Sequence, residues 1–297
     1  MKNFIIIVVV IIIAGVGIYI FTKKSSDSVV VPTETATSTE TSEVSDTEVD
    51  ESKTVIGKSV EGRDITAYHY GSGAKEILFV GGIHGGYSWN TALVAYEMMN
   101  YLESNTDIIP SNVKVTVIPV LNPDGLNKVV GTDGVFAKAD VSTSQTVRVS
   151  GRFNANEVDL NRNFDCDWQS VGMWQTTKVS GGSKAFSEPE SLAIQGYVTA
   201  HNLEAVVVWY SSAGGVYASS CGGSISPETR TLTSTYAKAS GYPQYDSFNY
   251  YPTTGDMVNW LAKNNIPAIS VLLTTHEDTE WSKNKKGLEA LLQYFAK

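Results

Sequence analysis

Alternating and continuous apolar runs along residues 53–297 predict strands and helices that follow one another in turn. Residues 53–70 have the pattern of a hairpin, because two alternating segments, TVIGKSV and DITAYHY, flank the turn residues Glu61 and Gly62. Short apolar runs predict further strands at 76–80 (EILFV), 113–120 (VKVTVIPV), 205–210 (AVVVWY) and 268–273 (AISVLL). Helical spacing covers residues 90–102, 188–201, 227–240, 255–263 and the stretch from 283 onward.

This order of elements predicts a single α/β domain. Strands that alternate with helices favour a mixed, mostly parallel central β-sheet with helices on both faces, and the hairpin is expected at one edge. In such sheets ligands bind beyond the carboxyl ends of the strands. The chemistry is therefore expected in the loops that follow the strands, at 81–90, 122–186, 211–223, 241–254 and from 272 onward.

The first 52 residues have a different composition from the rest. We interpret residues 1–24 as an N-terminal membrane anchor, because residues 4–21 carry no charge and 18 residues are about the minimum that spans a bilayer. A cleaved signal peptide is the alternative, although FTKKSSDS offers no small-residue cleavage site. Residues 25–52 hold thirteen Ser or Thr, eight acidic residues and no basic or aromatic one, which predicts a disordered linker. Residues 53–297 form the predicted folded domain.

The acidic balance of the chain comes mainly from the linker. The formal net charge is −9, of which −8 lies in residues 25–52 and only −4 in residues 53–297, while residues 1–24 carry +3. A nearly neutral domain without a basic stripe argues against nucleic acid as a partner.

The stretch from Gly151 to Trp168, GRFNANEVDLNRNFDCDW, carries the candidate binding chemistry. A guanidinium is always charged, and its planar fork of donors fits a carboxylate at two points. One arginine in a polar loop could equally form a surface ion pair. The stretch, however, resembles the arginine loop of the M14 metallocarboxypeptidases, which holds the substrate's C-terminal carboxylate and the oxyanion. The matching residues are Arg152, Asn161 and Arg162.

The resemblance covers nearly all of residues 53–297, and the motifs occur in the family's order: GGIHGGYSWN, NPDG, VDLNRNF, SEPES, WYSSAGG and AISVLLTTHEDTEW. It implies the zinc-carboxypeptidase fold. It also implies that Tyr251 matches the mobile tyrosine that covers the substrate. Val258 falls near the position that tunes side-chain preference, where an apolar residue suits an apolar C-terminal residue.

The catalytic positions implied by the resemblance are mostly replaced. A hydrolytic zinc site needs three protein ligands and one open position for water. His84 is the only ligand that remains, since Tyr87 and Ser211 occupy the other two ligand positions. Leu272 occupies the general-base position and cannot accept a proton. We therefore expect an inactive homologue that needs no cofactor and binds the C-terminal carboxylates of peptides or of cell-wall stem peptides.

Other functions stay open. One is an active metallocarboxypeptidase or cell-wall peptide hydrolase with a non-standard zinc site, rebuilt from His84, His276, Glu277 and Asp278. A purely structural role needs only the fold. Ser211 and Ser212 suggest a serine hydrolase, but neither lies in a G-x-S-x-G elbow and the sequence shows no acid-base partner near them.

Cys166 and Cys221 are the only cysteines. The family fold places both in loops at the active-site end of the sheet, so a disulfide is expected, with two unpaired thiols as the alternative. A disulfide indicates an oxidising compartment. Lys2 on one side of residues 4–21 nearly balances Lys23 and Lys24 on the other, so charge leaves the orientation open. Taken together, these features predict a single-pass protein of the cell membrane with an extracytoplasmic domain.

Overall fold

The computed structural model of the chain describes residues 51–297. The predicted anchor at 1–24, with its apolar stretch at 4–21, and the predicted linker up to residue 50 lie outside the described residues. Among the helices of residues 51–297, none has both the length and the apolar character that crossing a bilayer requires. The described residues, 51–297, belong to one compact unit.

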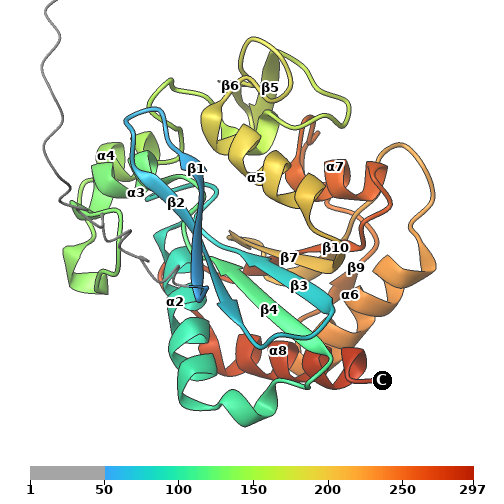
Figure 1. The fold of residues 1–297 in the computed structure, drawn as a ribbon. Coiled ribbons are helices and arrows are strands. Elements are labelled where there is room, and N and C mark those ends of the chain that lie inside the picture. The colour runs from blue at the N-terminus through green and yellow to red at the C-terminus, as the bar shows by residue number, and fades with distance from the viewer. Residues whose placement is uncertain (1–50) are drawn as a thin grey trace, which may run out of the picture. The chain divides into compact units, whose positions relative to one another are not determined.

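An eight-stranded mixed sheet forms the centre of this unit (Figure 1), with the strand order β1-β2-β4-β3-β7-β10-β8-β9. β3 runs parallel to both β4 and β7, and β10 runs parallel to β7, so these four strands make a parallel core. The predicted hairpin lies at one edge, as expected. The strands are β1 Lys53–Lys58, β2 Asp64–Tyr70, β3 Lys75–Val80, β4 Val113–Ile118, β7 Leu203–Ser211, β8 Gly215–Ala218, β9 Gln244–Tyr245 and β10 Ala268–Leu273.

Helices cover both faces of the sheet, which confirms the predicted class (Figure 1). Along β3 the side chains alternate: Ile77 and Phe79 pack in the cluster that includes α2, α6 and α8, while Leu78 and Val80 pack in the cluster with α5 and α7. Because both faces are covered, residues 77–80 of the strand are all apolar. The helices are α2 Trp89–Ser104, α3 Pro123–Val130, α4 Gln145–Ser150, α5 Pro189–Ala200, α6 Pro227–Ser240, α7 Met257–Lys263 and α8 Trp281–Phe295.

Several elements lie where the sequence indicated loops. NPDG begins α3, because Asn122 accepts a hydrogen bond from the amide of Gly125 and caps a helix whose first residue is Pro123. Asn, Pro, Asp and Gly are common in turns and at helix starts alike, so the pattern alone favoured a turn. The short strand β8 and a separate hairpin, formed by β5 Val171–Trp174 and β6 Thr177–Ser180, were also missed.

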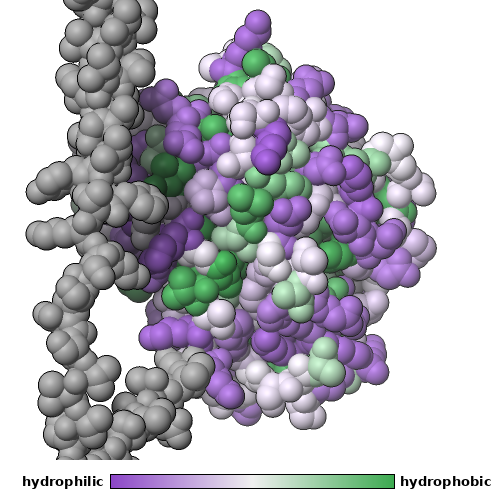
Figure 2. Space-filling view, turned by 45° about the horizontal axis from the view of Figure 1, so that its top comes forward, coloured by the Kyte–Doolittle hydropathy of each residue, from purple (hydrophilic) through white to green (hydrophobic). Residues whose placement is uncertain are grey.

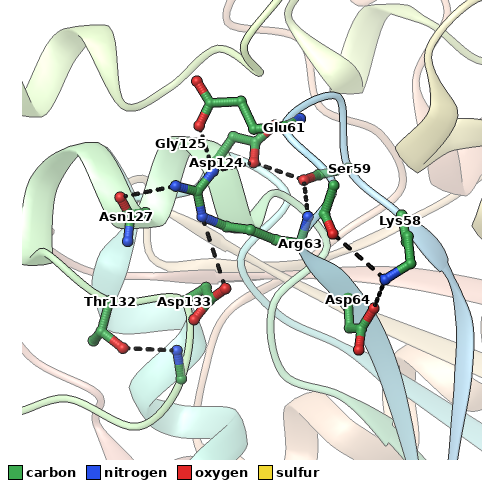
Figure 3. A network of polar contacts seen from close by, with 12 residues as sticks. Lys58, Ser59, Glu61, Arg63, Asp64, Asp124, Gly125, Asn127, Thr132 and Asp133 are labelled. Carbon is green, nitrogen blue, oxygen red and sulfur yellow. Dashed lines mark hydrogen bonds and ion pairs between the residues drawn. The ribbon is translucent and has the colours of Figure 1, made fainter.

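A polar network holds the turn of the β1–β2 hairpin against α3 (Figure 3). The guanidinium of Arg63 pairs with Asp124 at 2.7 Å and also contacts Glu61 and Asn127, as Figure 3 shows. Ser59 donates to the same Asp124 carboxylate at 2.6 Å. Since Asp124 is fully buried, these partners compensate its charge and fix the start of α3 relative to the sheet edge.

Apolar residues do not gather into one large patch on the face shown in Figure 2. They form small separate groups between hydrophilic residues there. Single exposed apolar side chains are normal on a surface that faces water.

Candidate functional site

A cavity of about 510 Å³ lies where the loops that follow β3, β7 and β10 meet. It brings together residues as far apart in the chain as His84 and His276, which 192 positions separate. Nearly all of the positions singled out from the sequence line it, namely His84, Tyr87, Arg152, Asn161, Arg162, Ser211, Ser212, Tyr251, Leu272 and His276. Val258 does not: it is buried on α7 and lines a smaller neighbouring cavity of about 70 Å³.

Three glycines allow the loops of this site to cross. Gly85 has a φ of +44°, and a side chain there would place its Cβ 2.6 Å from the carbonyl oxygen of Gly151. Gly125, of the NPDG motif, lies at the same crossing against Gly151. Asn122 of that motif also donates to the carbonyl of Arg152. NPDG therefore fixes the backbone on which both His84 and Arg152 are carried.

Arg152 is neutralised by a buried carboxylate. Its Nε and Nη2 both donate to Oδ2 of Asp159, at 3.0 and 2.8 Å, and its guanidinium carbon lies 4.6 Å from the centre of the Trp174 ring. Burial raises the pKa of the Asp159 carboxyl, but the charge of Arg152 outweighs it and holds that pKa well below its usual range. Arg152 is thus a rigid, already paired cation.

Arg162 is anchored differently. Its Nε and Nη2 donate to the carbonyl of Met173 at 3.1 and 2.7 Å, and its Nη1 donates to the carbonyl of Asn161 at 2.6 Å. Within residues 51–297, no carboxylate forms an ion pair with it, although its side chain is only 1% exposed. Its guanidinium carbon lies 5.9 Å from the centre of the Tyr251 ring. Its hydrogen-bond partners are therefore neutral groups, while the carboxylates of Asp159 and Asp256 interact with its charge from farther away.

The amide of Asn161 is oriented by its neighbours. Its Oδ1 accepts from the hydroxyl of Tyr210 and from the backbone N–H of Met257, both at 3.1 Å. With the oxygen fixed on these donors, the amide nitrogen is the group left for a ligand, beside Arg162.

A disulfide links this arginine segment to the loop that follows β8. Cys166 and Cys221 are bonded, with Cα atoms 5.9 Å apart, as predicted. The backbone N–H of Gly255, in the loop after Tyr251, donates to the carbonyl of Cys166 at 2.7 Å, and Phe164 donates back to Gly255. The loop that carries Tyr251 is thus bonded directly to the segment that carries Arg162.

The residues at the family's metal positions do not fit a hydrolytic zinc ion. His84 could offer a nitrogen, since neither ring nitrogen has a hydrogen-bond partner and Nε2 lies 3.5 Å from Asp159. Burial raises the pKa of the Tyr87 phenol, which therefore keeps its proton. The hydroxyl of Ser211 is engaged by protein groups. One imidazole with a neutral phenol and a neutral hydroxyl is not a zinc donor set.

The rebuilt site considered from the sequence is not assembled either. Glu277 points to Arg148 and Lys138, at 2.9 and 3.4 Å. In residues 51–297 the one group of three His, Cys, Asp or Glu ligand atoms within 4.8 Å of one another is Cys166, Asp167 and Cys221, whose cysteines are in the disulfide.

Ser211, His276 and Asn90 form a polar group at one side of the cavity. The Ser211 hydroxyl lies 2.8 Å from Nδ1 of His276 and 3.1 Å from Oδ1 of Asn90. Burial, followed by the charge of Arg152, lowers the pKa of His276 to about 4, so its imidazole is neutral at pH 7. This pair could not be read from the sequence, because 65 positions separate the two residues.

Asp256 is a second residue that sequence reasoning missed. It lines the cavity, is 7% exposed and caps α7 through a 2.8 Å bond from the N–H of Asn259. Burial raises the pKa of Asp256 to about 6. A cap before a helix was readable from the sequence, whereas its place at the cavity was not. Trp174 was missed because its hairpin was interpreted as part of a loop.

The chain is similar in sequence to known proteins. A family model described as zinc carboxypeptidase matches residues 42–287. The chain belongs to the zinc carboxypeptidase family. Among curated relatives, the γ-D-glutamyl-L-diamino acid endopeptidase 1 of Lysinibacillus sphaericus is 25% identical over 218 residues, which cover 67% of this chain and 54% of that protein. The carboxypeptidase B of Astacus astacus is 29% identical over 166 residues, 52% of each chain. The chain thus spans about half the length of these relatives.

Solved zinc carboxypeptidase structures share the fold. Bovine thrombin-activatable fibrinolysis inhibitor has a TM-score of 0.63 at 17% identity, covering 82% of this chain and 88% of that one. The murein-tripeptide amidase MpaA from Escherichia coli O157 has a TM-score of 0.55 at 20% identity, covering 81% and 91%. At these identities the likeness concerns the fold alone.

Proposed function

We propose that the cavity binds the free C-terminal carboxylate of a peptide and that the domain does not hydrolyse peptides through zinc. Arg162 carries this proposal. It is a buried guanidinium at the cavity wall whose protein partners, within residues 51–297, are backbone carbonyls rather than a carboxylate. Burying a charge without an opposite charge in contact is costly, and the carboxylates of Asp159 and Asp256 act on Arg162 only from farther away, so a ligand carboxylate in the cavity offsets part of that cost.

The groups around Arg162 suit this ligand. The amide nitrogen of Asn161 faces the same space, and Arg152 adds positive charge that Asp159 already compensates. Tyr251 lies over Arg162 and can close on a bound residue. A few charge-assisted hydrogen bonds must offset the ligand's lost freedom, so we expect a Kd of roughly 0.01–1 mM.

Paired peptides test the proposal. Titration by calorimetry compares each peptide that has a free C-terminus with its C-terminal amide, and we expect the amide to bind more weakly by about 1.5–3 kcal/mol. Arg162→Ala is expected to cause a loss of the same size. Lys286→Ala is the matched control, because it removes one positive charge from an exposed position of α8 away from the cavity.

Equal binding of the free and amidated peptides to the wild-type domain contradicts the proposal, even if Arg162→Ala folds poorly. In that case the arginines serve the fold only.

Cell-wall stem peptides are the ligand class we propose first. The relative from Lysinibacillus sphaericus is a γ-D-glutamyl-L-diamino acid endopeptidase, and the amidase of similar fold is named for murein tripeptide. A panel of stem tripeptides and ordinary peptides with free C-termini, titrated side by side, measures this preference. Tighter binding of ordinary peptides contradicts the assignment of the class but not of the carboxylate site.

We further infer that the domain is held outside the cytoplasmic membrane by residues 4–21. The Cys166–Cys221 disulfide supports an oxidising location, and the uncharged apolar stretch supports an anchor. Protease treatment of intact spheroplasts should degrade the domain, and the recovered membrane form should retain its original N-terminus. Protection of the domain contradicts the location, whereas a new N-terminus after residue 21 favours a cleaved signal peptide.

A further inference from the structure

Two strand ends bring a hydroxyl and an imidazole together in the cavity. Ser211 is the last residue of β7, and His276 follows the end of β10 by three residues. The two strands run parallel, and Ser211 pairs with Leu273 in their register. Their carboxyl ends therefore lie side by side, which places Oγ of Ser211 2.8 Å from Nδ1 of His276.

Asn90, near the start of α2, contacts Ser211 and the loop that carries His276. Its Nδ2 donates to the carbonyls of Thr275 and Asp278, at 2.8 and 2.9 Å, so the loop around His276 is held by the same amide that faces Ser211. Because both amide hydrogens are used, Oδ1 of Asn90 is an acceptor, and the hydroxyl of Ser211 can donate its one hydrogen either to it, at 3.1 Å, or to Nδ1 of His276, at 2.8 Å, when the imidazole carries its own hydrogen on Nε2. Asn90 and His276 thereby position the serine oxygen, and both Ser211 and His276 line the cavity.

We propose that Ser211 is a nucleophile and His276 its general base, so that the cavity is an acyl-transfer site that works without a metal. This activity goes beyond the binding function proposed above. A serine hydroxyl is a weak nucleophile unless an adjacent base takes its proton, and a hydrogen bond of 2.6–3.2 Å is the expected contact. The substrates are small esters and amides whose acyl carbon can reach Oγ.

The proposed acyl transfer changes no oxidation state and therefore needs no oxidant or reductant. Oγ of Ser211 attacks the acyl carbon and forms a C–O bond, while its proton moves to Nδ1 of His276. The carbonyl oxygen takes the electron pair and becomes an oxyanion. The bond to the leaving alcohol or amine then breaks as His276 returns the proton to it, and water hydrolyses the acyl-serine by the reverse proton path.

Arg152, paired with Asp159, is a fixed hydrogen-bond donor on the same side of the cavity. Its guanidinium carbon lies 5.7 Å from the centre of the Tyr87 ring, whose centre is 4.6 Å from that of His276. Its Nε and Nη2 are used by Asp159, which keeps the guanidinium in place. A fixed cation that needs no reorganisation during the reaction stabilises a developing oxyanion.

Covalent labelling tests the pair. The purified domain, kept in EDTA, is treated with a fluorophosphonate and separately with p-nitrophenyl acetate, and the peptide that contains Ser211 is analysed by mass spectrometry. We expect one label per chain, located on Ser211 and absent from Ser211→Ala. His276→Gln should slow labelling about 100-fold or more, since a general base contributes at least that much. Ser234→Ala, which changes an exposed serine of α6 outside the cavity, should label like the wild type.

Three results overturn the proposal: no label, a label on Ser212 or elsewhere instead, or a labelling rate on Ser211 that His276→Gln leaves unchanged. If His276→Gln fails to fold, the comparison of Ser211→Ala with Ser234→Ala decides alone. The peptide titrations described above use unlabelled protein. If the domain binds free carboxylates but takes no label, the binding proposal stands and the nucleophile proposal fails. If Ser211 is labelled but free and amidated peptides bind equally, the nucleophile proposal stands and the binding proposal fails.

Discussion

The disulfide should contribute a large share of the stability of the domain. It joins Cys166 to Cys221 across a sequence separation of 55 residues. In the chain-entropy account, closing a loop of that length restricts the unfolded chain by about 14 cal/mol/K, or about 4 kcal/mol at 25 °C. Domains are typically stable by about 5–15 kcal/mol, so the Cys166→Ala/Cys221→Ala variant should remain folded with a much reduced margin.

Urea denaturation followed by tryptophan fluorescence measures this loss as a lower midpoint. Wild-type domain in a reducing buffer should match the variant, and the oxidised chain should gain two daltons on reduction. The backbone bond between Gly255 and Cys166 and the packing of Phe164 on Trp260 hold the same segment without the disulfide. If the oxidised wild type and the variant differ by less than about 1 kcal/mol, loop closure is not the source of stability here, and the reasoning fails.

Three further outcomes are expected. Asp159→Asn should destabilise the domain by about 3–5 kcal/mol in urea, because it leaves Arg152 buried without its partner, whereas Asp246→Asn, in an exposed pair, should cost less than about 1 kcal/mol. Burial raises the pKa of Glu76, but hydrogen bonds from Thr116, Tyr197 and His201 outweigh it and lower that pKa to about 2. The stability from Glu76 is therefore present above the unfolded pKa near 4.5 and lost as the pH falls toward 2, and melts of Glu76→Gln should respond less to pH over that range; an unchanged response contradicts this assignment. Elemental analysis of dialysed domain should find well under one zinc per chain, and a full equivalent would return attention to an active metallopeptidase.

The parallel core of the sheet was predictable from the sequence, and the shorter elements were not. β3, β7 and β10 are apolar on both faces because helices cover both, and such runs are the clearest strand signal. β8 has four residues, the first of them a glycine, which is too few to show a period. α3 was hidden because its cap and first residues are also turn residues, and only the tertiary position of Gly125 decides between the two.

The residues of the functional site were likewise predictable from the sequence only in part. The arginine segment could be found because its residues are close in sequence and resemble a known loop. The partners of those residues could not, since Asp159 as the partner of Arg152 and Met173 as the partner of Arg162 depend on how the loops fold. The pairing of Ser211 with His276 depends on the neighbouring positions of β7 and β10, which no pattern within either strand contains.

The hydrogen bonds of Arg162 to backbone carbonyls determine the conditions under which this residue could bind a carboxylate. Its contacts within the described domain are main-chain oxygens, which neither titrate nor dissociate. A chelator therefore removes nothing from Arg162. On the acid side, Asp256 in the same cavity, whose pKa burial raises to about 6, changes its charge before the terminal carboxyl of a ligand becomes neutral near pH 3.5. A domain that binds carboxylates through Arg162 would keep its affinity where metal ions are scarce, conditions under which a metal-dependent relative would lose its ion.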